Sequence, residues 1–114
     1  MRSASLRTER GFLVCSNCAI ADTPFTRSRG LLGRSELAEG EGILLSPASS
    51  IHTFFMRFPI DVAFLDRDLV VQRIVERLPP WRMAGCRGTR AVLELPAGAC
   101  DTVGLREADK LVLG

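Results

Sequence analysis

The longest regular pattern in the chain is an alternation of apolar and polar positions over residues 51–65. One set of alternate positions is apolar apart from a single histidine: His52, Phe54, Met56, Phe58, Ile60, Val62 and Phe64. Alternation sustained over this length predicts extended chain rather than helix. Pro59 cannot donate to a strand ladder, so the pattern predicts two strands, or one strand with a bend, on either side of it.

Shorter apolar segments between turn residues predict the remaining strands. Residues 11–15 and 18–21 flank Ser16-Asn17, which favours a small hairpin. Further strands are expected at residues 43–45, 69–78, 91–95 and 111–113, and residues 79–90 are expected to form a long loop. The polar residues 1–10 are expected to be a flexible lead-in.

Two segments carry helix signals. Thr23-Pro24 suits a helix start, and Gly33 follows Leu32 as a stop signal. Residues 99–103 predict a single helical turn ended by Gly104. The whole pattern predicts an α+β, mainly β fold: a small barrel-like or curled antiparallel or mixed sheet with one packed short helix, formed by a single domain over residues 11–114.

Composition fits one globular domain. The chain has 114 residues, of which 46% are hydrophobic and 25% charged, and these values exclude wholesale disorder. The net charge of +2 gives no reason to expect a nucleic-acid partner. No apolar run approaches the roughly 18 residues that cross a membrane, and the N-terminus has no apolar core of a secretory signal. We therefore expect a cytoplasmic protein.

Three motifs recur in this order in a known family: residues 26–34 (TRSRGLLGR), 51–66 (IHTFFMRFPIDVAFLD) and 92–98 (VLELPAG). The combination resembles the domain of unknown function 192 family, also called uncharacterised protein family 0127. The similarity extends from Ala19 to Val112. It implies a compact, mainly β bacterial domain with a short helix and no established activity, so no catalytic residue is carried over.

The histidine-threonine form of the middle motif resembles a leaderless branch of that family, and the resemblance implies an accessory role near envelope or pilus assembly. One position departs from the family pattern. Ala108 stands before Asp109 where the family has a glycine, so we expect that turn to differ.

Two acids lie within segments that otherwise read as buried strands. Asp61 stands between Ile60 and Val62, and Glu94 between two leucines. A buried carboxylate needs a partner or becomes neutral, and Arg29 and Arg57 are the natural partners. This arrangement predicts a polar ligand pocket, a structural ion pair, or acids on an exposed sheet face.

His52 is the only histidine, and it shares a strand face with Met56 beside Thr53. Histidine with methionine suits a soft metal such as Cu(I), and histidine with cysteine suits nucleophilic chemistry. The simpler interpretation is a histidine at the rim of the core that is hydrogen-bonded to backbone.

Four cysteines raise the question of metal or redox chemistry. Cys15 and Cys18 form a CxxC, but Cys86 and Cys100 are too widely spaced in sequence to complete a zinc site of the usual pattern. A redox CxxC is expected at a helix N-terminus, whereas this one lies between predicted strands. We expect free thiols.

The loop over residues 79–90 combines Trp81 with Arg82, Arg87 and Arg90. An aromatic residue beside arginines suits base stacking or an acidic peptide. The alternative, which we favour from the sequence, is that Trp81 folds back over the core.

These observations predict a non-catalytic ligand-binding or accessory module without cofactor, metal or nucleic acid, a monomer or weak homodimer whose partner is a small polar ligand or a protein. The alternatives are a hydrolase that uses His52 with Asp61 or Glu94, and a metal-binding module on Cys15 and Cys18. The expected ligand-binding residues are Arg29, His52, Thr53, Met56, Arg57, Asp61 and Glu94.

Overall fold

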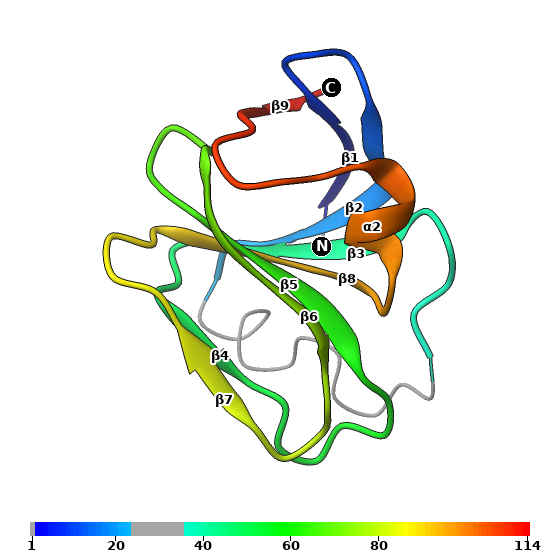
Figure 1. Cartoon of the computed structure of the whole chain (residues 1–114), viewed down its shortest axis with the longest axis vertical. Helices are drawn as coiled ribbons and strands as arrows, with labels where there is room; N and C mark the ends of the chain where they lie inside the picture. The colour runs from blue at the N-terminus through cyan, green and yellow to red at the C-terminus, as the bar shows by residue number, and fades with distance from the viewer. Residues whose placement is uncertain (1, 24–35) are drawn as a thin grey trace.

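The structure, a computed structural model, describes residues 2–23 and 36–114 and is built mainly of strands (Figure 1). Seven strands form one sheet in the order β6-β5-β8-β3-β2-β1-β9, and β4 and β7 form a second sheet. The elements are β1 (Arg2–Thr8), β2 (Leu13–Ala21), β3 (Glu41–Leu45), β4 (Ser50–His52), β5 (Ile60–Leu65), β6 (Val71–Leu78), β7 (Met83–Gly85), β8 (Ala91–Pro96), α2 (Ala99–Val103) and β9 (Leu111–Leu113). The mainly β prediction, with a short helix, is confirmed.

The large sheet is mixed and curled. β2 and β3 are parallel, and the other neighbouring strands are antiparallel. Near the start of β6, Val70 forms a bridge to Lys110, and Val71 N–H donates to the Asp109 carbonyl at 2.8 Å. These bonds draw one edge of the sheet toward the segment that leads into β9 at the other edge, so the sheet becomes a half-barrel.

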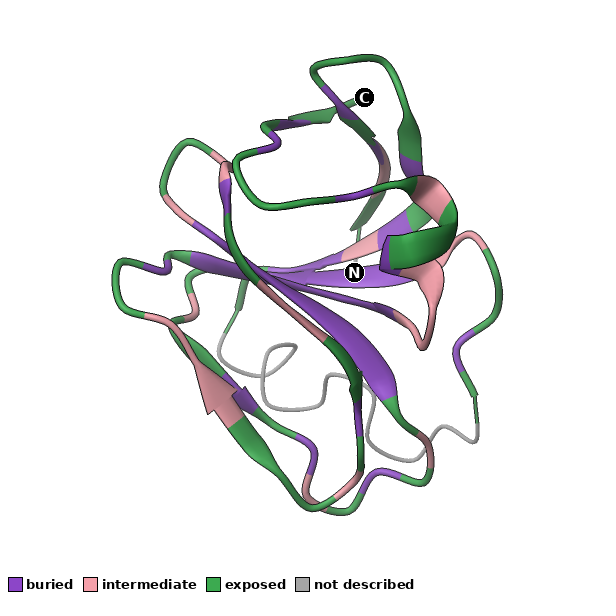
Figure 2. Cartoon of the chain, viewed as in Figure 1, coloured by how far each residue is buried: buried purple, intermediate pink, exposed green. Residues whose placement is uncertain are grey.

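The central strands are buried because both faces of the sheet are covered. Every residue of β5 is buried, and so are Ala91–Leu95 of β8 (Figure 2). Side chains alternate between two cores. Ala63 and Leu65 pack into the core beneath α2, whereas Val62 and Phe64 pack into the core that Ile51 of β4 also joins.

Two predictions for the N-terminal part were wrong. Arg2–Thr8 form β1 instead of a flexible lead-in, because Leu6 and Thr8 turn inward while the strand pairs with β2 and β9. Residues 13–21 form one strand instead of a hairpin. Ala4 pairs with Cys18 and Leu6 with Cys15, so β2 carries an extra residue there. Its exposed Ser16-Asn17 belong to this bulge, not to a turn.

The alternating stretch breaks at Pro59 as predicted, and β5 begins at Ile60. Residues 53–59 are a loop instead of a strand, and the expected loop at residues 79–90 contains β7, which pairs with β4. The helix predicted after Thr23-Pro24 falls outside the described residues. Ala108 adopts a φ of 73°, the left-handed region that favours glycine, so this turn keeps a glycine-like conformation without glycine.

Gly42 in β3 lies where the neighbouring strands leave no room for a Cβ. A Cβ there would lie 2.9 Å from Cys15 Sγ, 3.0 Å from Leu95 Cδ2 and 3.1 Å from the Glu94 carbonyl oxygen. We expect Gly42→Ala to lower the free energy of unfolding by about 1–3 kcal/mol, since overpacking forces neighbours to shift. Urea denaturation measures the loss. In a Cys15→Ala background the same change is expected to cost less, and an equal cost would mean that Sγ is not the obstacle.

Candidate functional site

The most unusual surface of the molecule is a cluster of aromatic side chains beside the β4–β7 sheet. His52 stacks on Phe54 with ring centroids 4.9 Å apart, Phe54 stacks on Trp81 at 5.9 Å, and Phe55 lies tilted against Trp81 at 4.7 Å. We call these four residues the aromatic tip. Phe55 is 69% exposed and Trp81 56% exposed, so their large apolar surfaces face solvent. Met83, opposite His52 in the β4–β7 ladder, is 71% exposed.

Thr53 holds the two loops of the aromatic tip together from beneath. Its side chain is fully buried, and its hydroxyl donates to the Pro79 carbonyl at 2.6 Å and accepts from Arg82 N–H at 2.9 Å. Its backbone N–H donates to the Arg82 carbonyl at 2.8 Å, and its carbonyl accepts from Trp81 N–H at 2.9 Å. Thr53 therefore fixes the 53–58 loop against the 79–82 loop.

The backbone at the aromatic tip adopts a conformation that costs free energy. Phe55 and Trp81 have φ values of 67° and 66°, in the left-handed region that residues with a Cβ disfavour. The Thr53 bonds and the Met56 N–H donated to the Thr53 carbonyl hold these loops in place. The strain coincides with the two aromatic residues that are held out in solvent.

The two segments that form the aromatic tip carry charges of one sign. Residues 46–60 and 79–90 contain four arginines, Arg57, Arg82, Arg87 and Arg90, and no aspartate or glutamate. All four are exposed. In the described part of the chain, the ion pairs are Arg2 with Asp22 and Arg10 with Asp109, and neither involves one of these four arginines. The guanidinium groups beside the aromatic tip are therefore not neutralised by these acids.

Four of the predicted site residues meet here. His52 and Thr53 belong to the aromatic tip and its support, Met56 is buried beneath it in the core shared with Ile51, and Arg57 is exposed on the same loop. His52 Nδ1 accepts from Phe54 N–H at 3.2 Å, as the simpler interpretation of the histidine expected. Trp81 does not fold back over the core. Its position after Pro79-Pro80 and beside Arg82 was the only sequence signal for this exposed role.

Asp61 has a different environment from the one expected. Its carboxylate is fully buried and accepts three backbone N–H groups: Arg77 at 2.9 Å and Gly98 at 3.0 Å on Oδ1, and Cys100 at 3.0 Å on Oδ2. Arg57 is exposed on the loop before β5 and, among the described residues, forms no ion pair with Asp61. Arg29 falls outside the described residues. The carboxylate joins β5 to β6 and to the start of α2.

Replacing Asp61 with asparagine tests this structural role. The amide NH₂ would face a backbone N–H that now donates to a carboxylate oxygen, so at least one buried donor loses its acceptor. We expect Asp61→Asn to lower the free energy of unfolding by at least about 2 kcal/mol. Urea denaturation measures it. A variant as stable as the parent would show that the three hydrogen bonds contribute nothing.

Glu94 faces the other side of the sheet from Asp61. Val62 pairs with Glu94 and Asp61 with Leu95, so alternation directs Glu94 toward the core of Val62 and Val92. Its side chain is almost wholly buried, and this burial raises the pKa of the Glu94 carboxyl to about 7. The two acids therefore do not form a paired-carboxylate site.

The raised pKa of Glu94 predicts a pH-dependent stability. In the unfolded chain the Glu94 carboxyl ionises near pH 4.5, whereas in the folded chain it keeps its proton up to about pH 7. The stabilisation of the fold that comes from this raised pKa is fully present below pH 4.5 and is lost as the pH rises toward 7. We expect the free energy of unfolding of Glu94→Gln to equal that of the parent at pH 4.5. At pH 8 it should be higher than that of the parent by roughly 3 kcal/mol. A constant difference between the two proteins over this range would contradict the assignment.

The structure does not gather the groups that the hydrolase hypothesis requires. His52 is exposed at the end of β4, on the side of the sheet opposite the α2 end where the Asp61 carboxylate is fully engaged. Glu94 lies within the apolar core between the β4–β7 sheet and the large sheet. The geometry thus gives no support to an acid and base pair built from His52 with either acid.

Three thiols share one core. Cys15, Cys18 and Cys100 are buried together beneath α2, while Cys86 packs against the core on the opposite face. The bulge in β2 turns Cys15 and Cys18 to the same side, and the hydrogen bond between them lowers the pKa of Cys15 and raises that of Cys18. All four are free thiols. Within residues 2–23 and 36–114, no three His, Cys, Asp or Glu side chains are arranged to hold a metal ion.

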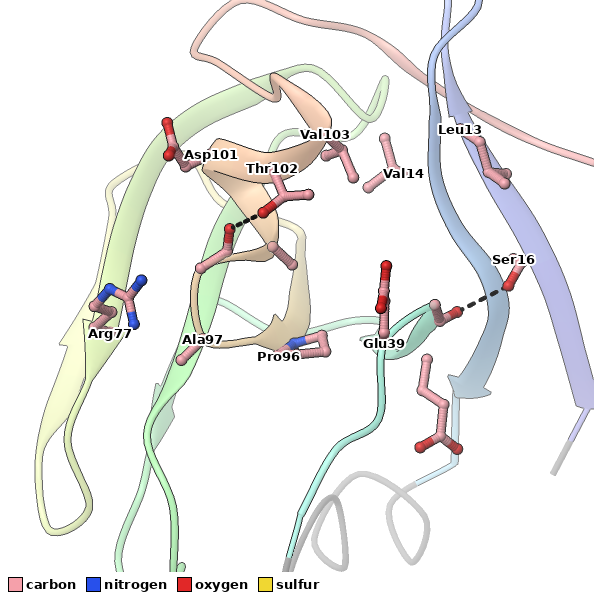
Figure 3. A pocket seen from close by; sticks show the side chains of 14 residues that line it. Leu13, Val14, Ser16, Glu39, Arg77, Pro96, Ala97, Asp101, Thr102 and Val103 are labelled. Atoms are coloured by element: carbon pink, nitrogen blue, oxygen red, sulfur yellow. Dashed lines mark hydrogen bonds between the residues drawn. The ribbon is translucent and has the colours of Figure 1, made fainter.

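A cavity of about 530 Å³ opens between α2 and the β2–β3 side of the sheet (Figure 3). Arg77, Glu39 and Asp101 line it together with the Pro96–Ala99 turn. Of the predicted ligand-binding residues that the structure describes, none lines this cavity. It is separate from the aromatic tip, which lies on the other side of the sheet.

Comparison with known proteins places this fold in a family. The model of the family described as "DUF192: Uncharacterized ACR" matches residues 5–113. The chain belongs to the DUF192 family. The resemblance seen in the three sequence motifs is thereby confirmed. A UPF0127 protein from Thermococcus sibiricus is 34% identical over 97 residues, which cover 81% of this chain and 62% of that relative. The chain thus spans less than two thirds of that protein's length.

Two solved structures share the DUF192 fold. A protein from Sinorhizobium meliloti 1021, described as a candidate transcription regulator, has a TM-score of 0.87 at 23% identity and covers 98% of this chain and 94% of its own. A protein of unknown function from Novosphingobium aromaticivorans has a TM-score of 0.82 at 24% identity, with coverages of 96% and 83%. At these identities the likeness concerns the fold alone. In the described part of this DUF192 chain, no helix has the length and apolar character to cross a membrane.

Proposed function

We propose that this DUF192 protein is a non-catalytic accessory module that docks on a partner protein through the aromatic tip. The observation that carries the proposal is the exposure of Phe55 and Trp81, which the buried Thr53 holds in a strained backbone. Exposed aromatic residues on a rigid support are typical of protein interfaces, where they supply most of the binding energy. The envelope or pilus setting that the resemblance implied is part of the proposal, and so is a cytoplasmic location.

The ring geometry favours a protein over a nucleic acid. A base-stacking platform needs open ring faces, whereas Phe54 and Phe55 both lie against Trp81, and His52 covers Phe54. The net charge of +2 also supplies little of the general attraction on which nucleic-acid binding depends. The exposed apolar surfaces of Phe55 and Trp81 suit apolar side chains of a protein partner.

Charge argues against a second copy of this chain as the partner. A symmetric dimer that joined the aromatic tips would bring Arg57 and Arg82 of each copy close to the same residues of the other. No acid within residues 46–60 or 79–90 would compensate that repulsion. A different protein therefore fits this surface better than self-association does.

Selection from a displayed library of random peptides tests the proposal. We expect the parent to enrich peptides whose binding falls at least about tenfold in Trp81→Ala and Phe55→Ala, since each change removes a central apolar contact. Phe12→Ala is the matched control, because Phe12 is 48% exposed and lies against Arg10, away from the aromatic tip. All three variants should unfold within a few degrees of the parent.

Two results would refute the docking role. The first is a selection that enriches no peptide above background. The second is a set of peptides whose binding is equal in the parent and in both aromatic-tip variants, because the docking surface would then lie elsewhere. Tight binding of an eight-residue oligothymidylate that depends on Trp81 would replace the protein partner with a single-stranded nucleic acid.

A further inference from the structure

We propose that the aromatic tip recognises a short acidic segment that carries one central apolar side chain. This inference rests on the proposed function and names the chemistry of the partner. It combines two features of one surface: exposed aromatic rings, and guanidinium groups that form no ion pair among the described residues.

Arg57 and Arg82 flank the aromatic rings, one on each loop. Arg57 follows Phe54, Phe55 and the buried Met56, and Arg82 follows Trp81 directly. Within residues 2–23 and 36–114, the side chain of Arg82 forms a single hydrogen bond, a 3.4 Å contact from Nη1 to the carbonyl of Trp81. Its guanidinium is therefore largely free to bind a carboxylate, for which arginine offers paired N–H donors.

The basic character continues along the β4–β7 sheet. Arg73 of the neighbouring strand β6 donates to the Gly85 carbonyl at 2.8 Å, which places its charge beside β7. Arg87 and Arg90 follow β7 along the chain, and both are exposed. A ladder of three residue pairs is about 10 Å long. An extended acidic segment that crosses the aromatic tip can thus meet arginines on both sides of its apolar anchor.

The aromatic rings strengthen these contacts by excluding water. An apolar side chain of the segment that covers Trp81 and Phe55 lowers the local dielectric, and an arginine–carboxylate pair at the edge of that contact gains energy relative to an open surface. A peptide without acids lacks the arginine–carboxylate pairs, and an acidic peptide without a central apolar side chain lacks the contact with Trp81 and Phe55. The inference therefore predicts that both parts are needed in one peptide.

The fluorescence of the single tryptophan gives a direct measurement, because Trp81 lies in the aromatic tip. The probes are four: the blocked peptide Glu-Asp-Glu-Leu-Glu-Asp-Glu, the same peptide with glycine for leucine, the same peptide with lysine for every acid, and an eight-residue oligothymidylate. We expect the first to bind at least about tenfold more tightly than the other three, and to weaken as salt rises from 50 to 200 mM.

A double variant separates charge from apolar contact. Arg57→Gln with Arg82→Gln should weaken the acidic leucine peptide about tenfold, since two charge-assisted contacts are lost. Arg67→Gln is the matched control, because Arg67 is an exposed arginine in the β5–β6 turn at the opposite end of β5. It should bind the peptide as the parent does.

The outcomes distinguish this inference from the proposed function. Equal binding of the acidic and lysine peptides, or no effect of the double variant, overturns the acidic partner, while Trp81-dependent peptides from the display selection would leave the docking role intact. Preferential binding of the oligothymidylate overturns both in favour of a nucleic acid. Failure of every probe, together with an empty display selection, overturns both without replacement.

Discussion

The position of the aromatic tip depends on one buried carboxylate. Asp61, at the second residue of β5, accepts N–H groups from β6 and from the turn into α2. The β6 residue it holds is Arg77, whose φ of 53° interrupts the β5–β6 register just before the strand ends at Leu78. The loop that carries Trp81 begins at the next residue. A group that forms no part of the binding surface thus determines where that surface starts.

The central sheet was predictable because its residues obey simple rules. β5 and β8 are apolar apart from one acid each, as expected of strands covered on both faces. The helix α2 is bounded by Gly98 and Gly104 in left-handed conformations. The bulge in β2 was not predictable. Its polar Ser16-Asn17 pair has the composition of a turn. Only the pairing with β1 shows that residues 13–21 form one strand, and the polar sequence of β1 predicted a flexible segment instead.

The candidate site was predictable in its location more than in its chemistry. Four residues of the 51–66 motif that were predicted to bind a ligand, His52, Thr53, Met56 and Arg57, lie together at the aromatic tip or directly beside it. That they bind a ligand stays a prediction. The partners of the acids were predicted wrongly because the sequence does not show which backbone groups come close to a side chain. Nothing in it reveals that the Asp61 carboxylate accepts three backbone N–H groups. Nor does it reveal which faces Asp61 and Glu94 take, since that follows from the pairing of β5 with β8. Trp81 was misjudged because burial is the usual fate of a lone tryptophan.

The pairing of β1 with β9 has a mechanical consequence. The two strands are antiparallel, with Leu6 opposite Leu113, and Gly114 N–H donates to the Ser5 carbonyl at 2.8 Å. The N-terminal end of β1 and the C-terminal end of β9 therefore lie at the same end of this pair. Tension applied to the two chain ends therefore unzips this strand pair, so that its hydrogen bonds break one after another instead of all at once as in shearing. The terminal strands would detach at low force, whereas β5 and β8, at the centre of the sheet, would be the last strands to bear the force.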